Sequence, residues 1–468
     1  MKIDIGQKEN IHFIGLGGIG MSGLAQVMKT MGFKIQGSDL NINKNVENCK
    51  NLGIKFFKGH KKSNIKNATI LVKSSAIKNN NSEIIEAKKR KLPVYERVEM
   101  LANIVSLKKN IIVTGSHGKT TTTSLIAKIL LESKLDPTII NGGVINSLKN
   151  NAKLGNGEWT VLEADESDGS FLKLPINYSI VTNIDKEHLD YYKNFNNLEK
   201  NFIKFINRTP PIGKCIICGD DRNIKKIINK IDTNNILTYG FNKNNHYQIT
   251  KPKFNSNNCK FELVIKKLNR KKLIFKNITL NLIGKHNILN SVAAISVCLS
   301  LGINIKIIKK ALIKFTGVQR RMTKIFVKNE NVFYDDYAHH PTEISSVLEG
   351  IRNVSGNRKI ISVFQPHRYS RLKMLKKEFS KSFIFSDQVI LCPVYAAGEK
   401  IDKNFNLISF GNQISKNSNV QVIILKNEDE LRKFMKKNLI KNEIIIGMGA
   451  GSISNWMRNL KTIYANKQ

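Results

Sequence analysis

The sequence has no long apolar run of the kind that crosses a membrane or directs export. No stretch approaches the roughly 18 uninterrupted apolar residues of a spanning helix. The first residues, MKIDIGQKENIHFIG, lack the apolar core and small-residue cleavage site of a signal peptide. We therefore expect a cytoplasmic protein that makes no contact with a membrane.

Cysteine is also scarce, and its spacing argues against a disulfide scaffold. Six cysteines are scattered over 468 residues, which suits a reducing compartment. Cys215 and Cys218 form a C-x-x-C in the apolar run KCIICG, with no second such pair and no histidine pair at zinc spacing nearby. We interpret both as buried thiols of a strand rather than as a metal or redox site.

Acidic residues are few relative to basic ones. There are 36 aspartates and glutamates against 76 lysines and arginines, a formal net charge of +40. Such an excess is typical of nucleic-acid binders, but here the basic residues are spread evenly, with no aromatic-basic RNA-binding motif and no basic tail. We interpret the excess as compositional drift and expect no nucleic-acid partner. The charge would still attract a polyanionic small molecule such as a nucleotide sugar.

Length and pattern predict three α/β domains. At about 150 residues per domain, the chain has room for three. Short apolar strands alternate with helical segments three times, as in parallel sheets. Residues 246–283 alternate in hydrophobicity like antiparallel strands and predict a small β insertion. We predict a Rossmann-like domain over 1–107, a P-loop ATPase-like parallel sheet with the insertion over 108–315, and a second Rossmann-like domain over 316–468.

The strongest local motif is TGSHGKTT, residues 114–121, between an apolar strand and a helix. This is the setting of a phosphate-binding loop, in which glycines let backbone amides turn toward phosphate oxygens. We expect Lys119 to reach the β- and γ-phosphates of ATP and the Thr120 hydroxyl to bind Mg²⁺. Val113 stands where the common spacing has glycine, so this is the shorter G-x-x-G-K-T form.

Two acidic segments follow the next strands. EADESD (163–168) and NIDKEHLD (183–190) both come at the carboxyl ends of apolar runs. Those ends meet at one edge of a parallel sheet, and carboxylate oxygens near a triphosphate suit Mg²⁺. A lone histidine such as His188 is more often structural, so its role as a ligand is less expected from the residues alone.

The first domain contains GLGGIG, residues 15–20, directly after a strand, and Asp39 ends the following strand. This is the dinucleotide fingerprint, with a tight turn for a pyrophosphate and an acid for a ribose hydroxyl. It is compatible with an NAD(P)-dependent oxidoreductase. The same geometry also holds other pyrophosphates, including that of a UDP-sugar.

Two polar clusters follow strands of the third domain. DDYAHHPTE (335–343) and QPHRYSR (365–371) concentrate histidines and arginines at presumed carboxyl ends of parallel strands. A pair of arginines on one loop suits a carboxylate, because a guanidinium binds it in a two-pronged fork.

The ordered set of motifs resembles the Mur ligase family over essentially the whole chain. The set comprises GLGGIGMSG, TGSHGKTTT, EADESD, TNIDKEHLD, GKHNILN, GVQRRM, DDYAHHPTE, FQPHRYSR and GAGS. The glycine fingerprint, DDYAHHPTE and QPHRYSR are similar to the subgroup that acts on UDP-N-acetylmuramic acid itself. The resemblance implies ATP-dependent joining of L-alanine to that sugar acid, with Mg²⁺, in the synthesis of the cell-wall peptide.

The resemblance also implies roles for particular residues. The UDP-sugar would bind at Gly17, Gly18, Gly20, Ser22, Asp39, Ser74 and Ser75. ATP would bind at Gly115, Ser116, His117, Gly118, Lys119, Thr120, Thr121, Asn287, Asn290, Arg321 and Asp336. The amino acid would bind at His339, His367, Arg368 and Arg371, and the metal at Thr120, Glu166 and His188. The catalytic residues would be Lys119, His188, His339 and Arg321.

The implied chemistry activates a carboxylate as an acyl phosphate, which the amine of L-alanine then attacks. His339 is a candidate for the base that deprotonates the amine. The intermediate must be kept from water, so we expect the third domain to close when ligands bind. We expect a monomer or homodimer. The alternatives are a related ligase that recycles murein peptides, the NAD(P)-dependent oxidoreductase, and a nucleic-acid binder that only the charge supports.

Overall fold

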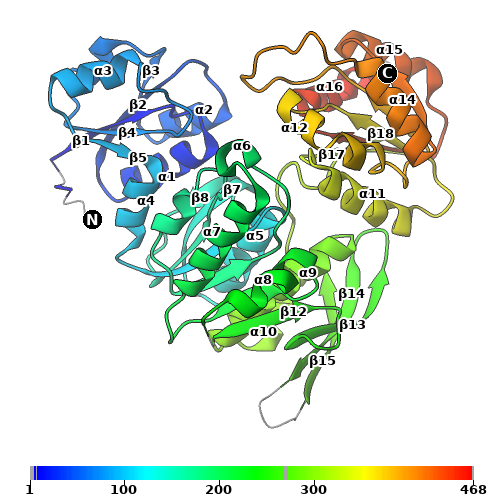
Figure 1. The fold of residues 1–468 in the computed structure, drawn as a ribbon, viewed down its shortest axis with the longest axis horizontal. Coiled ribbons are helices and arrows are strands. Elements are labelled where there is room, and N and C mark those ends of the chain that lie inside the picture. The colour runs from blue at the N-terminus through cyan, green and yellow to red at the C-terminus, as the bar shows by residue number, and fades with distance from the viewer. Residues whose placement is uncertain (1–4, 7, 234, 267–271, 466–468) are drawn as a thin grey trace. The chain divides into compact units, whose positions relative to one another are not determined.

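The computed structural model describes residues 5–6, 8–233, 235–266 and 272–465. The chain divides into two compact units (Figure 1). The larger unit comprises Met1–Lys251, Phe261–Thr279 and Leu289–Thr316, and the smaller comprises Pro252–Lys260, Leu280–Ile288 and Gly317–Gln468.

The larger unit begins with a five-stranded parallel sheet. Its strands, in spatial order, are β3 (Lys55–Lys58), β2 (Lys34–Asp39), β1 (Asn10–Ile14), β4 (Ile70–Lys73) and β5 (Val94–Glu96). The connecting helices are α1 (Ile19–Thr30), α2 (Lys44–Asn51), η1 (Lys62–Ile65), α3 (Ser82–Lys89) and α4 (Arg97–Val105). The direction of strand succession reverses between β1 and β4, and open α/β sheets bind ligands at such a point.

A ten-stranded sheet follows. Its spatial order is β15 (Lys272–Leu280), β14 (Cys259–Lys266), β13 (Tyr247–Phe254), β12 (Ile236–Gly240), β11 (Cys215–Cys218), β10 (Tyr178–Val181), β6 (Lys109–Thr114), β9 (Trp159–Glu163), β7 (Thr138–Ile145) and β8 (Asn150–Lys153). Its helices are α5 (Lys119–Glu132), η2 (Ser170–Lys173), α6 (Leu189–Tyr192), α7 (Phe195–Asn207), α8 (Arg222–Ile227), η3 (Ile228–Lys230), α9 (Lys285–Ser300) and α10 (Ile305–Ile313). From β7 through β9, β6, β10, β11 and β12 to β13 the neighbours are parallel.

The smaller unit contains a six-stranded sheet. Its order is β16 (Thr323–Lys328), β17 (Asn331–Asp336), β21 (Ile444–Met448), β18 (Ile360–Phe364), β19 (Gln388–Leu391) and β20 (Gln421–Ile424). Only the outer pair β16–β17 is antiparallel among these neighbours. Its helices are α11 (Pro341–Ser355), α12 (Tyr369–Met374), α13 (Lys376–Ser380), α14 (Leu407–Ser418), α15 (Glu428–Asn438) and α16 (Ile453–Ala465).

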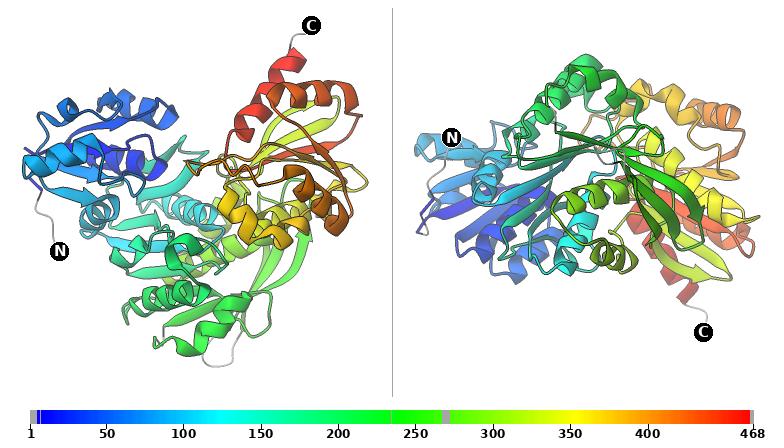
Figure 2. Two further views of the ribbon diagram at one scale, coloured as in Figure 1. Left: turned by 45° about the horizontal axis from the view of Figure 1, so that its top comes forward. Right: turned by 90° about the horizontal axis from the view of Figure 1, so that it is seen from below.

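The alternation of side chains along its strands gives this sheet an apolar core on each face. On β21, Ile444 and Ile446 pack into a cluster with residues of α11 and α14, whereas Ile445 packs into a second cluster with residues of α15 and α16. Helices accordingly cover both faces (Figure 2). A parallel sheet buried on both faces requires strands that are apolar throughout, as IIIGM of β21 is.

The predicted fold class is confirmed, with three successive α/β sheets. The predicted β insertion corresponds to β13–β15, and the structure adds that these strands continue the central sheet, since β12 and β13 pair in parallel. The strands β3, β5 and β8 have only four, three and four residues, and runs this short show no clear apolar pattern from which to predict them.

Candidate active site

The phosphate-binding loop lies between the buried strand β6 and helix α5, as predicted. Gly115 has φ +125° and Gly118 has φ +82°. A Cβ on Gly115 would lie 2.2 Å from Thr182 Oγ1, and one on Gly118 would lie 2.4 Å from Asn290 Oδ1. Both positions therefore require glycine, for the backbone conformation and for the space.

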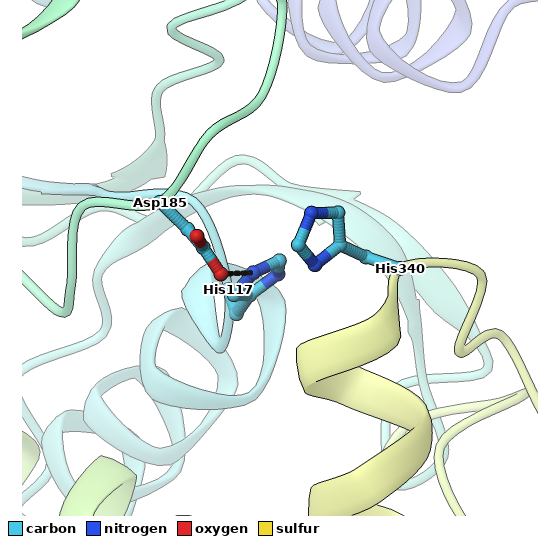
Figure 3. A group of neighbouring side chains, drawn as sticks. All are labelled: His117, Asp185 and His340. Atoms are coloured by element: carbon cyan, nitrogen blue, oxygen red, sulfur yellow. Dashed lines mark hydrogen bonds and ion pairs between the residues drawn. The ribbon is translucent and has the colours of Figure 1, made fainter. Parts of the chain in front are cut away.

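The segment that follows β10 holds this loop in shape. The His117 amide donates to Asn183 Oδ1 (2.8 Å), and the Thr182 hydroxyl donates to His117 O (2.6 Å). The Asp185 amide donates to the Ser116 hydroxyl (2.8 Å). His117 Nε2 lies 3.2 Å from Asp185 Oδ2 (Figure 3). His340, also drawn there, belongs to the smaller unit. Part of the segment expected near Mg²⁺ thus supports the phosphate-binding loop.

Lys119 begins α5 and pairs with a buried carboxylate. Its Nζ lies 2.8 Å from Glu166 Oε2 and donates to Gly115 O at 2.6 Å. Burial alone would lower the pKa of Lys119, but the carboxylates of Glu166, Asp165 and Glu163 raise it well above its usual range. The ammonium is therefore fixed in its charged form beside the loop.

The carboxylates in this region outnumber the lysine. Burial, with repulsion from Asp165 and Glu187, raises the pKa of Glu166, whereas the ion pair with Lys119 lowers it and favours the ionised carboxylate. Asp165, Glu166 and His188 each offer a ligand atom, and these atoms lie within 4.8 Å of one another. Excess negative charge and hard oxygen donors fit a divalent cation such as Mg²⁺.

The Thr120 hydroxyl contacts Glu163, which belongs to the acidic segment EADESD predicted near Mg²⁺ but not to the individual ligands that the resemblance implies. Thr120 Oγ1 donates to Glu163 Oε1 at 3.0 Å, and the Gly142 amide donates to Glu163 Oε2 at 2.7 Å. Glu163 ends β9, which pairs directly with β6. Its place as the last residue of that apolar strand was the available signal.

The glycine-rich turn of the first sheet is held by a hydrogen bond to the carboxylate of Asp39. Gly15 has φ +85°, and the Gly17 amide donates to Asp39 Oδ2 at 2.8 Å. A Cβ on Gly15 would lie 3.3 Å from Ser74 Cβ, so the ends of β1 and β4 lie side by side. Ser22 is fully buried and its hydroxyl donates to Ile19 O, which directs it into the helix.

In the smaller unit, Asp336 ends β17 and is buried. It accepts hydrogen bonds from the amides of Met322 and Ala338, both at 2.7 Å. Burial raises its pKa to about 6, although Arg321 and the two amides oppose this. The Arg321 guanidinium lies 5.3 Å from the centre of the Tyr337 ring, a cation–π distance.

His339 and His367 lie side by side, with ring centres 5.5 Å apart. His339 Nδ1 lies 2.9 Å from Tyr337 O, which can only accept, so Nδ1 carries the proton and Nε2 keeps a lone pair. Arg371 Nη1 donates to His367 Nδ1 at 3.2 Å. Burial, His339 and the arginines 371 and 368 lower the pKa of His367 to about 3.

Arg368 is the N-cap residue that precedes α12, and it has a strained conformation with φ +68°. Tyr395 O accepts a hydrogen bond from its amide at 2.9 Å, and the Tyr395 ring stacks on His367 at 5.7 Å and 13°. Two arginines beside a neutral histidine form a site that suits a carboxylate.

The two predicted adenine-binding asparagines lie on one helix, α9, three residues apart and so on the same side of it. Asn287 is buried, and its side chain donates to Ile283 O at 2.8 Å. Asn290 is buried beside Gly118. Within the larger unit, the structure brings Lys119, Thr120, Glu166 and His188 together, and within the smaller it brings together Arg321, Asp336, His339, His367, Arg368 and Arg371.

Three α/β sheets, with a phosphate-binding loop and an acidic cluster on the second, define a nucleotide-binding protein of the P-loop type. Family models match in order: the Mur ligase family catalytic domain over 10–109, the Mur ligase middle domain over 113–298, and the Mur ligase glutamate ligase domain over 320–451. The chain belongs to the Mur ligase family.

The chain is also similar to individual members of this family over almost its whole length. The chain is 55% identical to the UDP-N-acetylmuramate–L-alanine ligase of Pelagibacter ubique, over 98% of this chain and 99% of that protein. It is 43% identical to the ligase of the same name from Rickettsia felis, covering 97% and 96%. The crystal structure of the Thermotoga maritima UDP-N-acetylmuramate–alanine ligase matches with a TM-score of 0.83 at 28% identity, covering 98% and 100%.

A murein peptide ligase from Psychrobacter arcticus matches with a TM-score of 0.71 at 20% identity, over 98% of this chain and 99% of that chain, and shares the fold. Across the described residues, no helix combines the length and apolar character needed to cross a bilayer.

Proposed function

We propose that the chain joins L-alanine to the carboxylate of UDP-N-acetylmuramic acid, with ATP converted to ADP and phosphate, in peptidoglycan precursor synthesis. The observation that carries this proposal is 55% identity along the whole chain to a relative named for that reaction. The chemistry of the two site regions supports it: one suits a triphosphate, and the other suits an amino-acid carboxylate.

In this proposal, each of the three sheets belongs to a part of the chain that binds a different substrate. Residues 1–107 bind the UDP-sugar, 108–315 bind ATP, and 316–468 contribute the amino-acid site and further ATP contacts. Around the glycine-rich turn, Gly17, Gly18, Gly20, Asp39, Ser74 and Ser75 face the sugar nucleotide. We retain Ser22 only as a support of the first turn of α1, because its hydroxyl bonds within the helix.

The reaction begins when the sugar-acid carboxylate attacks the γ-phosphorus of ATP, which forms an acyl phosphate and releases ADP. Lys119 neutralises charge on the transferring phosphoryl group, with Arg321 assigned to the same task. Mg²⁺, when bound, adds further neutralisation. Thr120, Glu166 and His188 are its proposed ligands, and Glu163 joins them because it is the carboxylate at Thr120.

The amine of L-alanine then attacks the acyl carbon, and the tetrahedral intermediate expels phosphate. Arg368, Arg371 and His367 hold the amino-acid carboxylate. His339 takes the proton from the ammonium through Nε2, since Nδ1 already donates to Tyr337 O. Free, buried thiols at all six cysteines are compatible with a reducing cytoplasm, the compartment we propose.

The acceptor amine separates this proposal from its nearest rival. Purified protein is given ATP, Mg²⁺ and UDP-N-acetylmuramic acid with either L-alanine or L-alanyl-γ-D-glutamyl-meso-diaminopimelate, and the products are weighed by mass spectrometry. The proposal expects the L-alanine adduct with high efficiency. Preferential transfer to the tripeptide would replace the proposal with a peptide-recycling ligase.

A further inference from the structure

A cavity of about 380 Å³ lies in the larger unit, where the first sheet meets loops of the central sheet. Lys73, Ser75 and Arg97 line it from the first sheet and its connections, and Asp168 and Lys173 line it from the central part. Ser75 is one of the residues expected to bind the UDP-sugar. None of the charged residues in this lining has been given an individual role so far.

The two lysines of the cavity are already neutralised. Lys73 Nζ lies 2.9 Å from Glu96 Oε1, and Lys173 Nζ lies 2.9 Å from Glu99 Oε1. Arg97 differs, because among the residues that the structure describes no hydrogen bond or ion pair engages its guanidinium, and it is half-buried. A partly desolvated guanidinium gains most from an anionic ligand that supplies the missing hydrogen bonds.

The guanidinium lies against the glycine-rich turn. A Cβ on Gly20 would be 3.1 Å from Arg97 Nη1 and 3.4 Å from Arg97 Cζ. Gly20 is in the first turn of α1, whose amides give that end of the helix partial positive charge. Because Gly20 has no side chain, the Arg97 guanidinium can approach this end of the helix. There the positive charge of the guanidinium adds to the partial positive charge of the helix amides.

We propose that Arg97 binds the diphosphate of the UDP-sugar as a two-pronged donor beside the glycine-rich turn. The inference rests on the proposed function, in which the glycine-rich turn takes a sugar nucleotide. It adds to the sugar-nucleotide site a residue of α4, 77 positions after Gly20. This residue binds the diphosphate and not the uracil or the sugar. The planar fork matches phosphate oxygens better than a lysine ammonium does.

The test measures equilibrium binding of UDP-N-acetylmuramic acid, UDP-glucose, UDP and uridine by calorimetry to the wild type, Arg97→Ala and Arg97→Lys. Lys89→Ala, at an exposed lysine of α3, is the control for the loss of one positive charge. Both Arg97 variants are first checked for unchanged thermal unfolding and ATP binding. Arg97→Ala should weaken UDP and UDP-N-acetylmuramic acid by a similar factor, about tenfold or more, and leave uridine unaffected.

Arg97→Lys should recover only part of that affinity, and Lys89→Ala should match the wild type. An Arg97→Ala protein that binds UDP as tightly as the wild type overturns the inference. So does a loss confined to UDP-N-acetylmuramic acid, which would place the guanidinium on the sugar's carboxylate. If the wild type itself binds UDP-N-acetylmuramic acid no better than UDP-glucose, the proposed function fails instead, and the two failures are distinguishable.

Discussion

The Thr120 hydroxyl donates a 3.0 Å hydrogen bond to Glu163, whereas the neighbouring Lys119 pairs with Glu166. The two adjacent residues of the phosphate-binding loop therefore use two different carboxylates. A hydroxyl whose proton points at Glu163 presents its oxygen lone pairs elsewhere, which is how a threonine binds a cation. The structure thus separates the carboxylate at the hydroxyl that we propose as a metal ligand from the carboxylate that pairs with the lysine.

This separation predicts different outcomes for two similar substitutions. Glu163→Gln should raise the Mg²⁺ concentration for half-maximal phosphate release by about tenfold, the effect typical of a lost metal-shell contact. Glu166→Gln should also raise that Mg²⁺ concentration, but it removes a negative charge beside Lys119 and should therefore tighten nucleotide binding measured without Mg²⁺. Equal Mg²⁺ dependence of Glu163→Gln and the wild type would show that Glu163 has no part in holding the ion.

Gly115 is expected to be intolerant of any side chain. Gly115→Ala would place a Cβ 2.2 Å from Thr182 Oγ1 and should cost about 3 kcal/mol of unfolding free energy and abolish ATP binding. Gly32→Ala is the matched control, since Gly32 also has positive φ (+97°) but nothing within 4 Å of its Cβ position. It should cost about 1–2 kcal/mol, for the backbone alone. Denaturant unfolding that ranks the two equally would contradict the predicted clash.

His367 should stay uncharged across the physiological range. Its pKa falls from 6.5 to about 3 because of burial and the charges of His339, Arg371 and Arg368. Because the folded value is depressed, His367 contributes stability that is present above pH 6.5 and is lost as the pH falls toward 3. His367→Gln should therefore show a shallower loss of unfolding free energy on acidification. Unfolding curves with the same pH slope as the wild type would refute this.

Arg371 should affect the amino acid and not the nucleotide. Arg371→Gln removes one guanidinium from the proposed carboxylate site and should raise the KM for L-alanine by about tenfold or more. The KM for ATP should change little. Arg432→Gln, on α15 beside Glu428, is a control for the loss of an arginine elsewhere in the same unit. Parallel increases in both KM values would remove Arg371 from the amino-acid site.

The sequence predicts the fold class well because each sheet is built from apolar runs that alternate with helices over short distances. IIIGM of β21 and NIIVT of β6 are recognisable without tertiary information. The joining of β13 to the central sheet depends on a long-range pairing with β12, which no local pattern encodes.

The sequence predicts a site residue where a chemically suited side chain stands at a defined place in a local motif, as at Lys119 and Thr120. It does not predict a role that depends on a contact between residues far apart in the chain. Glu163 meets Thr120 from 43 positions away, and Arg97 lies against the turn at Gly20 from another helix. Asp39 was expected at a ribose, yet its carboxylate also caps the Gly17 amide, a contact that spacing alone does not reveal.

The most direct test of the proposed function is phosphate release from ATP with Mg²⁺, UDP-N-acetylmuramic acid and L-alanine, with each component omitted in turn. We expect release only when all four are present, and no release from Lys119→Ala, which lacks the ammonium that lies at the phosphate-binding loop. Release that persists without the sugar nucleotide, or that Lys119→Ala retains, would contradict it.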